Sequence, residues 1–270
     1  RRLPKPKRLA SRVAVVTGGG SGIGRATVEA LVRDGAAVVI ADRNLIAAQE
    51  LAIALGGPDI AIAVEADVTS EEAIKAMIAN ACLAFGGVDL IVNNAGLSLS
   101  RDLLSTTVDD WDLQHDVMAR GSFLVSRESA RAMIAQRMGG DIVYIASKNA
   151  VFAGPSNIAY SSAKADQAHQ VRLLAVELGE YGIRVNGINP DGVVQGSGIF
   201  AGGWGANRAA VYGVEEKDLG TFYAQRTVLK REVLPEHIAL AVAAIVSDEF
   251  SRTTGMVIPV DSGVAAAFVR

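Results

Sequence analysis

Three residues between Ser147 and Lys164 have the types and spacing of an acid–base centre: Ser147, Tyr160 and Lys164. Tyr160 and Lys164 are four positions apart, which places both side chains on one face of a helix. A phenol with a pKa of ~10 is a poor base at neutral pH, but a nearby ammonium favours the phenolate. We expect Tyr160 to exchange a proton with a substrate oxygen, Lys164 to lower the pKa of Tyr160, and Ser147 to donate to that oxygen. Alone, such a pair is usually a surface Tyr and a solvated Lys, so this hypothesis requires a hydride carrier elsewhere in the chain.

A glycine-rich loop near the N-terminus can bind such a carrier. The loop reads G-G-G-S-G-I-G from Gly18 to Gly24, after a predicted strand at Val13–Thr17 and before an amphipathic helix that runs to about Arg33. In this context glycines allow backbone N–H groups to approach a pyrophosphate at the helix N-terminus, although an ordinary glycine turn is the alternative. The contacts predicted from the loop come from Gly18, Ser21, Gly22, Ile23 and Gly24.

The acidic residue after the second predicted strand bears on the choice of carrier. The strand is Ala37–Ala41, and Asp42 follows it. A carboxylate at this point accepts hydrogen bonds from the ribose hydroxyls and repels a 2′-phosphate, which favours NAD over NADP. Arg43 could offset part of the repulsion.

Strand and helix patterns alternate along the rest of the chain. This alternation predicts one Rossmann-type α/β domain over 12–270, with a doubly wound parallel sheet and helices on both faces. The further expected strands are Ile60–Ala66, Val88–Val92, Asp141–Ala146, Ile183–Ile188 and Met256–Val260. The further expected helices are Asn44–Leu55, Glu71–Phe85, two within Val108–Arg137, Tyr160–Tyr181 and Pro235–Ser247.

Two segments fall outside this alternation. The basic, proline-containing residues 1–11 are interpreted as a solvated linker or N-terminal arm. Residues 195–234 carry several glycines and aromatics without a clean strand, and we expect a lid with short helices there.

Composition excludes several other classes of function. The 270 residues are 50% hydrophobic with a net charge of −3, which fits a folded domain and gives no case for nucleic-acid binding. A single cysteine, Cys82, excludes a cysteine metal cluster, and we expect no metal. No apolar run reaches the ~18 residues of a membrane span, and no secretory signal is visible, so a cytoplasmic protein is expected.

Together these motifs resemble the short-chain dehydrogenase/reductase family over most of the chain, from about Arg12 to Gly263. The motifs follow one another in the family's order: T-G-x3-G-x-G at Thr17–Gly24, Asp42, Asp67-Val68, N-N-A-G at Asn93–Gly96, Ser147, Y-x-x-x-K at Tyr160–Lys164, and N-P at Asn189-Pro190. The resemblance implies a Rossmann fold and nicotinamide chemistry.

The resemblance also implies residue roles. Tyr160 is the acid/base, Ser147 polarises the substrate oxygen, and Lys164 both lowers the Tyr160 pKa and holds the nicotinamide ribose. Further cofactor contacts are implied for Arg43, Asp67 and Val68 toward the adenosine, for Asn93, Asn94, Ala95 and Gly96 along the cofactor path, and for Pro190 and Val193, the latter beside the carboxamide.

The chain departs from the family's pattern in three places. Met118 stands where an Asn usually supports a proton relay, and a thioether cannot donate a hydrogen bond. Lys164 is therefore expected to need another proton route. The usual N-P-G reads N-P-D-G, and the terminal D-G-G reads Asp261-Ser262-Gly263.

A narrower resemblance concerns the dehydrogenase part of bifunctional rhamnulose-phosphate aldolase/lactaldehyde dehydrogenases. It rests on A-S-K-N (Ala146–Asn149), N-P-D (Asn189–Asp191), N-R-A-A-V-Y-G (Asn207–Gly213), F-Y-A-Q-R-T-V-L-K (Phe222–Lys230) and similar segments. It implies oxidation of L-lactaldehyde to L-lactate with NAD, and a possible fused aldolase domain upstream. A homotetramer or homodimer is expected. The alternatives are a polyol or sugar dehydrogenase of the same fold and a non-catalytic NAD-binding sensor.

Overall fold

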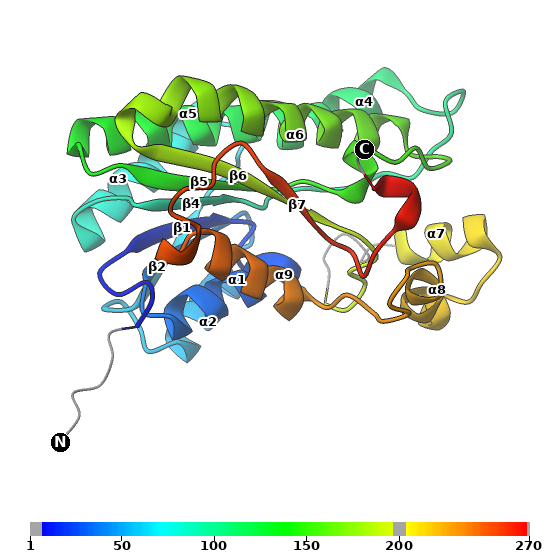
Figure 1. Cartoon of the computed structure of the whole chain (residues 1–270), viewed down its shortest axis with the longest axis horizontal. Helices are drawn as coiled ribbons and strands as arrows, with labels where there is room; N and C mark the ends of the chain where they lie inside the picture. The colour runs from blue at the N-terminus through cyan, green and yellow to red at the C-terminus, as the bar shows by residue number, and fades with distance from the viewer. Residues whose placement is uncertain (1–6, 197–203, 269–270) are drawn as a thin grey trace.

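The computed structural model describes residues 7–196 and 204–268. In this part of the chain, seven strands form one parallel sheet in the order β3-β2-β1-β4-β5-β6-β7 (Figure 1). The prediction of a parallel, doubly wound α/β fold is confirmed. The strands are β1 (Val13–Thr17), β2 (Ala37–Asp42), β3 (Ala61–Glu65), β4 (Leu90–Asn93), β5 (Gly140–Ile145), β6 (Ile183–Pro190) and β7 (Val257–Val260).

Helices cover both faces of the sheet, because the strands are apolar on both sides (Figure 1). One face carries α3 (Glu71–Phe85), α4 (Val108–His115), α5 (Gly121–Gln136) and α6 (Ile158–Leu178). The other carries α1 (Gly22–Arg33), α2 (Leu45–Ala54) and α9 (Pro235–Ile245).

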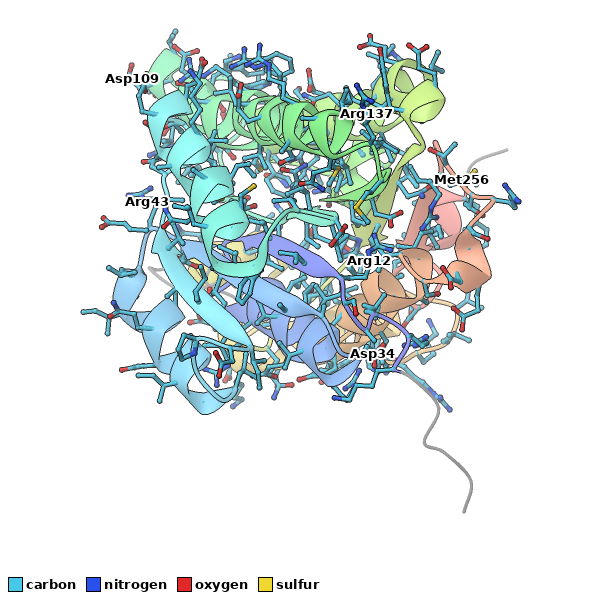
Figure 2. The ribbon with its side chains drawn as sticks, turned by 90° about the vertical axis from the view of Figure 1, so that its left-hand side faces the viewer. Arg12, Asp34, Arg43, Asp109, Arg137 and Met256 are labelled. Carbon is cyan, nitrogen blue, oxygen red and sulfur yellow. The ribbon has the colours of Figure 1, made fainter. Side chains whose placement is uncertain are left out.

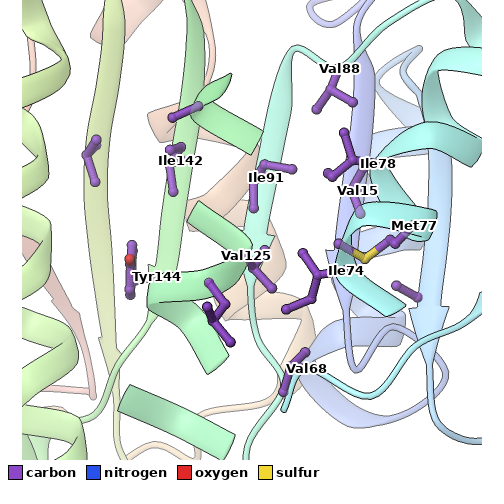
Figure 3. Close-up of a cluster of buried hydrophobic side chains, with 14 of the residues drawn as sticks. Val15, Val68, Ile74, Met77, Ile78, Val88, Ile91, Val125, Ile142 and Tyr144 are labelled. Atoms are coloured by element: carbon purple, nitrogen blue, oxygen red, sulfur yellow. The ribbon is translucent and has the colours of Figure 1, made fainter. Parts of the chain in front are cut away.

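Successive strand residues point to opposite faces of the sheet and pack into two separate hydrophobic cores. On the α3/α5/α6 face, Val15, Ile91 and Ile142 pack with Ile74 and Val125, as Figure 3 shows. On the opposite face, the neighbouring strand residues pack against α1, α2 and α9. Both faces of the sheet are therefore covered by packed side chains, so a functional site is expected at one of the two ends of the strands.

Local signals explain where the main helices begin. Ser70 caps α3 by accepting from the Ala73 N–H at 3.2 Å. Thr107 and Asp110 form a reciprocal capping box at the start of α4. The predicted region 108–137 holds two helices as expected, but they are joined by a π-helical turn, η1 (Asp116–Arg120), that periodicity does not reveal.

The strand order reverses between β1 and β4, which opens a crevice at the carboxyl ends of these strands. Beyond those ends lie two short helices, α7 (Trp204–Tyr212) and α8 (Leu219–Gln225), set apart from the layers of the sheet (Figure 1). Both fall in the segment predicted as a lid, of which residues 197–203 lie outside the description.

The opposite, amino end of the sheet is held by a buried ion cluster. Asp141 at the start of β5 accepts from Arg12 and Arg184, with N–O distances of 2.6 Å each. Figure 2 shows Arg12 near the middle of the molecule, between Arg43 and Met256 at its two sides. The cluster joins β5 and β6 to the residue that precedes β1, so its role is structural.

The described part of the predicted N-terminal arm packs on the fold. Leu9 is buried in the core beside α1, and its N–H donates to Asp34 O at 2.9 Å. Residues 1–6 lie outside the described residues. None of the helices in the described ranges is long and apolar enough to cross a membrane.

Candidate active site

The structure brings Ser147, Tyr160 and Lys164 into one cleft, which Pro190 and Val193 also line. Ser147 follows the carboxyl end of β5, and Tyr160 and Lys164 lie in the first turns of α6. α6 begins at Ile158, two residues before the predicted start, so both side chains are held by regular helix. The Ser147 N–H donates to Asn189 Oδ1 at 3.1 Å, which fixes the end of β5 to β6.

Tyr160 is held as a neutral phenol in this arrangement. Burial raises its pKa to about 12, and a hydrogen bond with Ser147 acts in the opposite direction. The expectation that Lys164 sets the Tyr160 pKa therefore needs correction, because burial dominates. The Lys164 Nζ lies 5.8 Å from the centre of the Tyr160 ring and donates to other partners.

Lys164 is 3% exposed, and its burial lowers its pKa to about 7. Its ammonium donates to Ile145 O at 2.7 Å and to Gln167 Oε1 at 2.9 Å, both neutral acceptors. At a pH between the pKa of Lys164 and that of Tyr160, Tyr160 keeps its proton and Lys164 has lost one. The pair then holds one of the two protons that it can carry. It can then take a proton from substrate near neutral pH, which neither group does alone at its ordinary pKa.

Gln167 is a site residue that sequence reasoning missed. It is 1% exposed, and its two amide atoms face different partners. While Oε1 accepts from Lys164, Nε2 donates to the Met118 carbonyl oxygen at 2.9 Å. A chain of hydrogen bonds thus runs from Lys164 through Gln167 to the π-helical turn. The signal was a polar residue three positions after Lys164, on the same face of α6.

Met118 has a structural explanation in this arrangement. Its side chain is fully buried in the core below Gly96, and a Cβ on Gly96 would lie 3.6 Å from the Met118 sulfur. Only the backbone carbonyl of Met118 takes part in the polar network. The Gln167 amide joins Lys164 to this carbonyl, and another proton route from Lys164 stays a prediction.

A groove continues from this cleft to the glycine loop. The two share Ile23, Asn94 and Gly96 as lining residues. Gly24 does not line the groove, because it lies against the loop itself, where a Cβ would come within 2.0 Å of Gly18 O. The remaining predicted cofactor residues line the groove: Gly18, Ser21, Gly22, Asp42, Arg43, Asp67, Val68 and Ala95.

Asp42 closes the groove at the end of β2. Its carboxylate accepts from the Gly20 N–H at 2.9 Å and from the Asn44 N–H at 2.8 Å, which fixes its orientation. Arg43 is largely exposed and lies at the edge of the molecule (Figure 2). Its guanidinium lies 3.9 Å from Asp67. A hydrogen bond from the Thr69 backbone keeps the pKa of Asp67 below its ordinary value. Carboxylates rather than free cations therefore dominate this end of the groove.

The two asparagines after β4 have different places. Asn94 lines the groove, and its amide donates to the carbonyls of Thr17 and Gly18 at 2.9 and 3.0 Å. Asn93, expected along the cofactor path, is buried instead and donates to Ser126 Oγ at 2.9 Å. Asn93 is the last residue of a buried strand, and its side chain points into the α5 face of the sheet.

Part of the cleft lining is charged, which the sequence motifs did not indicate. Lys148, Asp191, Arg208 and Tyr223 line it beside Ser147 and Tyr160. The inserted Asp191 of N-P-D-G thus reaches the cleft, and Gly192 takes the positive φ of 63°. A Cβ on Gly192 would lie 2.7 Å from Tyr223, so the close packing of α8 requires glycine. The described residues hold no group of three or more His, Cys, Asp or Glu side chains suited to a metal ion.

Comparison with known proteins gives a consistent family. Residues 18–265 match the family model described as enoyl-(acyl carrier protein) reductase. The chain is 43% identical to the uncharacterized oxidoreductase YuxG of Bacillus subtilis over 270 residues, which cover 99% of this chain and 39% of that protein. It is 34% identical to (−)-isopiperitenol/(−)-carveol dehydrogenase of Mentha piperita, over 96% of this chain and 95% of the relative.

A solved structure agrees with these relatives. A short-chain type dehydrogenase/reductase from Mycobacterium marinum superimposes with a TM-score of 0.85 at 27% identity, covering 96% of this chain and 98% of that one. The parallel sheet, the glycine loop at the crevice and the cleft of Ser147, Tyr160 and Lys164 fit the same family. The chain belongs to the short-chain dehydrogenase/reductase family of oxidoreductases.

Proposed function

We propose that this protein is an NAD-dependent oxidoreductase that acts on a small hydroxylated aldehyde or alcohol, with L-lactaldehyde as the substrate and L-lactate as the product. One observation carries the proposal: the cleft that holds Ser147, Tyr160 and Lys164 opens directly into the groove of the glycine loop. A substrate carbon and a cofactor ring can therefore share one space, as hydride transfer requires.

The groove fits a dinucleotide by its own geometry. The Gly18–Gly24 contact leaves no room for a side chain, so glycine at position 24 allows the tight turn before α1, and Gly18, Ser21 and Gly22 line the groove where phosphates would approach. Asp42 lines the adenosine end, where a carboxylate suits ribose hydroxyls and repels a 2′-phosphate. The Arg43–Asp67 pair also supports NAD over NADP. The Arg43 guanidinium already has an acidic neighbour, so its charge is less available to a 2′-phosphate.

The protein residues handle the proton. When bound, the nicotinamide supplies the hydride acceptor. Oxidation of an aldehyde hydrate to an acid removes one hydride from carbon and one proton from a hydroxyl group, and the acid then ionises. The Tyr160–Lys164 pair lacks one proton near neutral pH, so it takes up the hydroxyl proton as a unit: Tyr160 receives that proton, its own phenolic proton passes to Lys164, and Lys164 then carries the positive charge. Ser147 donates to the oxygen that becomes the carbonyl.

The segments that carry the narrower resemblance support lactaldehyde as the substrate. These segments are far apart in the sequence, yet each supplies a residue to the lining of the same cleft. The residues are Lys148, Asp191, Arg208 and Tyr223. Substrate specificity resides in such contacts around the reacting group rather than in the fold.

The test is NADH formation with small aldehydes and polyols at fixed NAD. We expect turnover with L-lactaldehyde and with few other compounds. A marked preference for a polyol or a sugar would replace the substrate but retain the enzyme class. Absence of turnover with every member, in protein that binds NAD, would favour a non-catalytic NAD-binding sensor.

A further inference from the structure

Two cations that take no part in the proposed proton transfer are buried in the same cleft as the acid–base centre. Lys148 is 4% exposed and Arg208 is 3% exposed, and both line the cleft that contains Ser147 and Tyr160. Cationic side chains are almost never this buried without an anionic partner. Their partners in the protein are therefore informative.

The protein does not fully neutralise these two cations. The Lys148 Nζ lies 3.6 Å from Asp191 Oδ1 and 4.4 Å from the centre of the Phe152 ring, and it makes no hydrogen bond shorter than this within the described residues. Burial lowers the pKa of Lys148 and raises that of Asp191, so neither charge is well compensated.

Arg208 has acceptors but no acidic partner in the described residues. Its guanidinium donates to Ser100 Oγ, Pro155 O and the Tyr212 hydroxyl, at 3.3, 3.1 and 2.7 Å. These acceptors are neutral, and Nε is buried without a hydrogen bond in the described residues. Residues 1–6, 197–203 and 269–270 contain no Asp or Glu, and the terminal carboxylate of Arg270 is the only other acidic group there.

We infer that Lys148 and Arg208 bind the carboxylate of the product in this cleft, beside Ser147 and Tyr160. Arg226 and Asp261 also act on the Lys148–Asp191 pair, so with Arg208 three cations face two carboxylates. One positive charge is left, which matches a carboxylate rather than a phosphate dianion. The inference rests on the proposed function, because an aldehyde oxidase forms this anion from a neutral hydrate beside Ser147. In this oxidation the carboxyl carbon is the carbon that gives up the hydride, so one carboxylate oxygen lies beside Ser147 and Tyr160 and the other faces Lys148 and Arg208, which line the same cleft.

Equilibrium binding tests the inference without turnover. The NADH complex is titrated with L-lactate and with L-lactamide, a neutral analogue of nearly the same shape, and NADH fluorescence is recorded. We expect L-lactate to bind at least tenfold tighter, because a charge-assisted hydrogen bond is lost in the amide. If NADH does not bind, titration calorimetry without NADH measures the affinities of L-lactate and L-lactamide instead.

Variants locate the anion in the cleft. Lys148→Met should remove most of the preference for L-lactate, and Lys148→Arg should restore part of it. Lys217→Met is the matched control, since Lys217 is exposed and paired with Glu215 at 2.7 Å. Arg208→Gln gives a second reading if Lys148→Met does not fold.

Three results would overturn the inference: equal binding of L-lactate and L-lactamide, an unchanged preference in both Lys148→Met and Arg208→Gln, or tighter binding of inorganic phosphate than of L-lactate. Each can occur in a protein that oxidises aldehydes, so the inference can fail while the proposed function stands. Conversely, a protein that binds L-lactate at Lys148 but forms no NADH would refute the proposed function alone.

Discussion

Replacement of Gln167 should move the pH dependence of turnover in a direction set by the new side chain. In the wild type, Lys164 has two neutral acceptors and a pKa of about 7, well below its ordinary value of 10.5. Gln167→Glu would place a carboxylate 2.9 Å from the Lys164 Nζ position, while Gln167→Leu would remove the acceptor.

The magnitude follows from the buried geometry. Two unit charges ~4 Å apart at an effective dielectric constant of ~20 attract by about 4 kcal/mol, equivalent to about 3 pKa units. The cost of burying the new carboxylate subtracts from this value. We expect Gln167→Glu to raise the pKa of Lys164 by about 1–3 units and Gln167→Leu to lower it further.

The assay is kcat/KM for substrate oxidation against pH. Oxidation requires the Tyr160–Lys164 pair to hold only one of the two protons that it can carry. Because Lys164 loses its proton at a pKa of about 7, activity in the wild type should rise with pH through about 7. Because Lys164 keeps its proton to higher pH in Gln167→Glu, the rise should move to higher pH. It should move to lower pH in Gln167→Leu.

Gln170→Glu is the matched control. Gln170 lies one turn along α6 and bonds Tyr144 and the Ala119 carbonyl, not Lys164. Its substitution should leave the profile in place. Shifts of the same sign for both Gln167 variants, or an unchanged profile in both, would refute the role of Lys164 and Gln167 in setting the working pH.

The other predictions concern selectivity and stability. Asp42→Ala should weaken NAD binding at least tenfold and weaken NADP binding less, as titration of both cofactors would show; an unchanged ratio would assign selectivity elsewhere. Met118→Asn should lower the free energy of unfolding by about 1–3 kcal/mol in urea, because it buries an unsatisfied amide, and should not raise kcat. A faster Asn variant would show that the side chain at position 118 can carry a proton route from Lys164. Asp141→Ala should cost about 3–5 kcal/mol, since it leaves two arginines unpaired, whereas Asp34→Ala, whose partner Arg8 is half exposed, should cost under ~1 kcal/mol. Equal losses in these two variants would contradict a structural role for the Asp141 cluster.

The sequence predicts the fold well because the strand and helix signals are local. Apolar runs at β1, β2 and β5 and caps such as Ser70 are properties of a few neighbouring residues, and the strands lie within a few residues of the predicted ranges. Parallel strands then bring Asp42, Asn94 and Ser147 to one edge of the sheet.

The parts that were missed depend on contacts between distant elements. Gln167 becomes a site residue only because the π-helical turn presents the Met118 carbonyl to α6, and Arg208 only because α7 brings it into the cleft that contains Ser147. Asn93 and Asn94 are adjacent in an N-N-A-G motif, and only the pleat of β4 decides which one faces the groove. The pKa values of Tyr160 and Lys164 likewise reflect burial rather than their spacing.

The most direct test of the proposed function compares Tyr160→Phe with the wild type in two measurements, NADH formation from L-lactaldehyde and the dissociation constant for NAD. The variant removes only the phenolic oxygen, so turnover should fall by ~10²-fold or more while NAD binding changes little. Near-normal turnover in Tyr160→Phe would contradict the assignment of Tyr160 as the acid–base group.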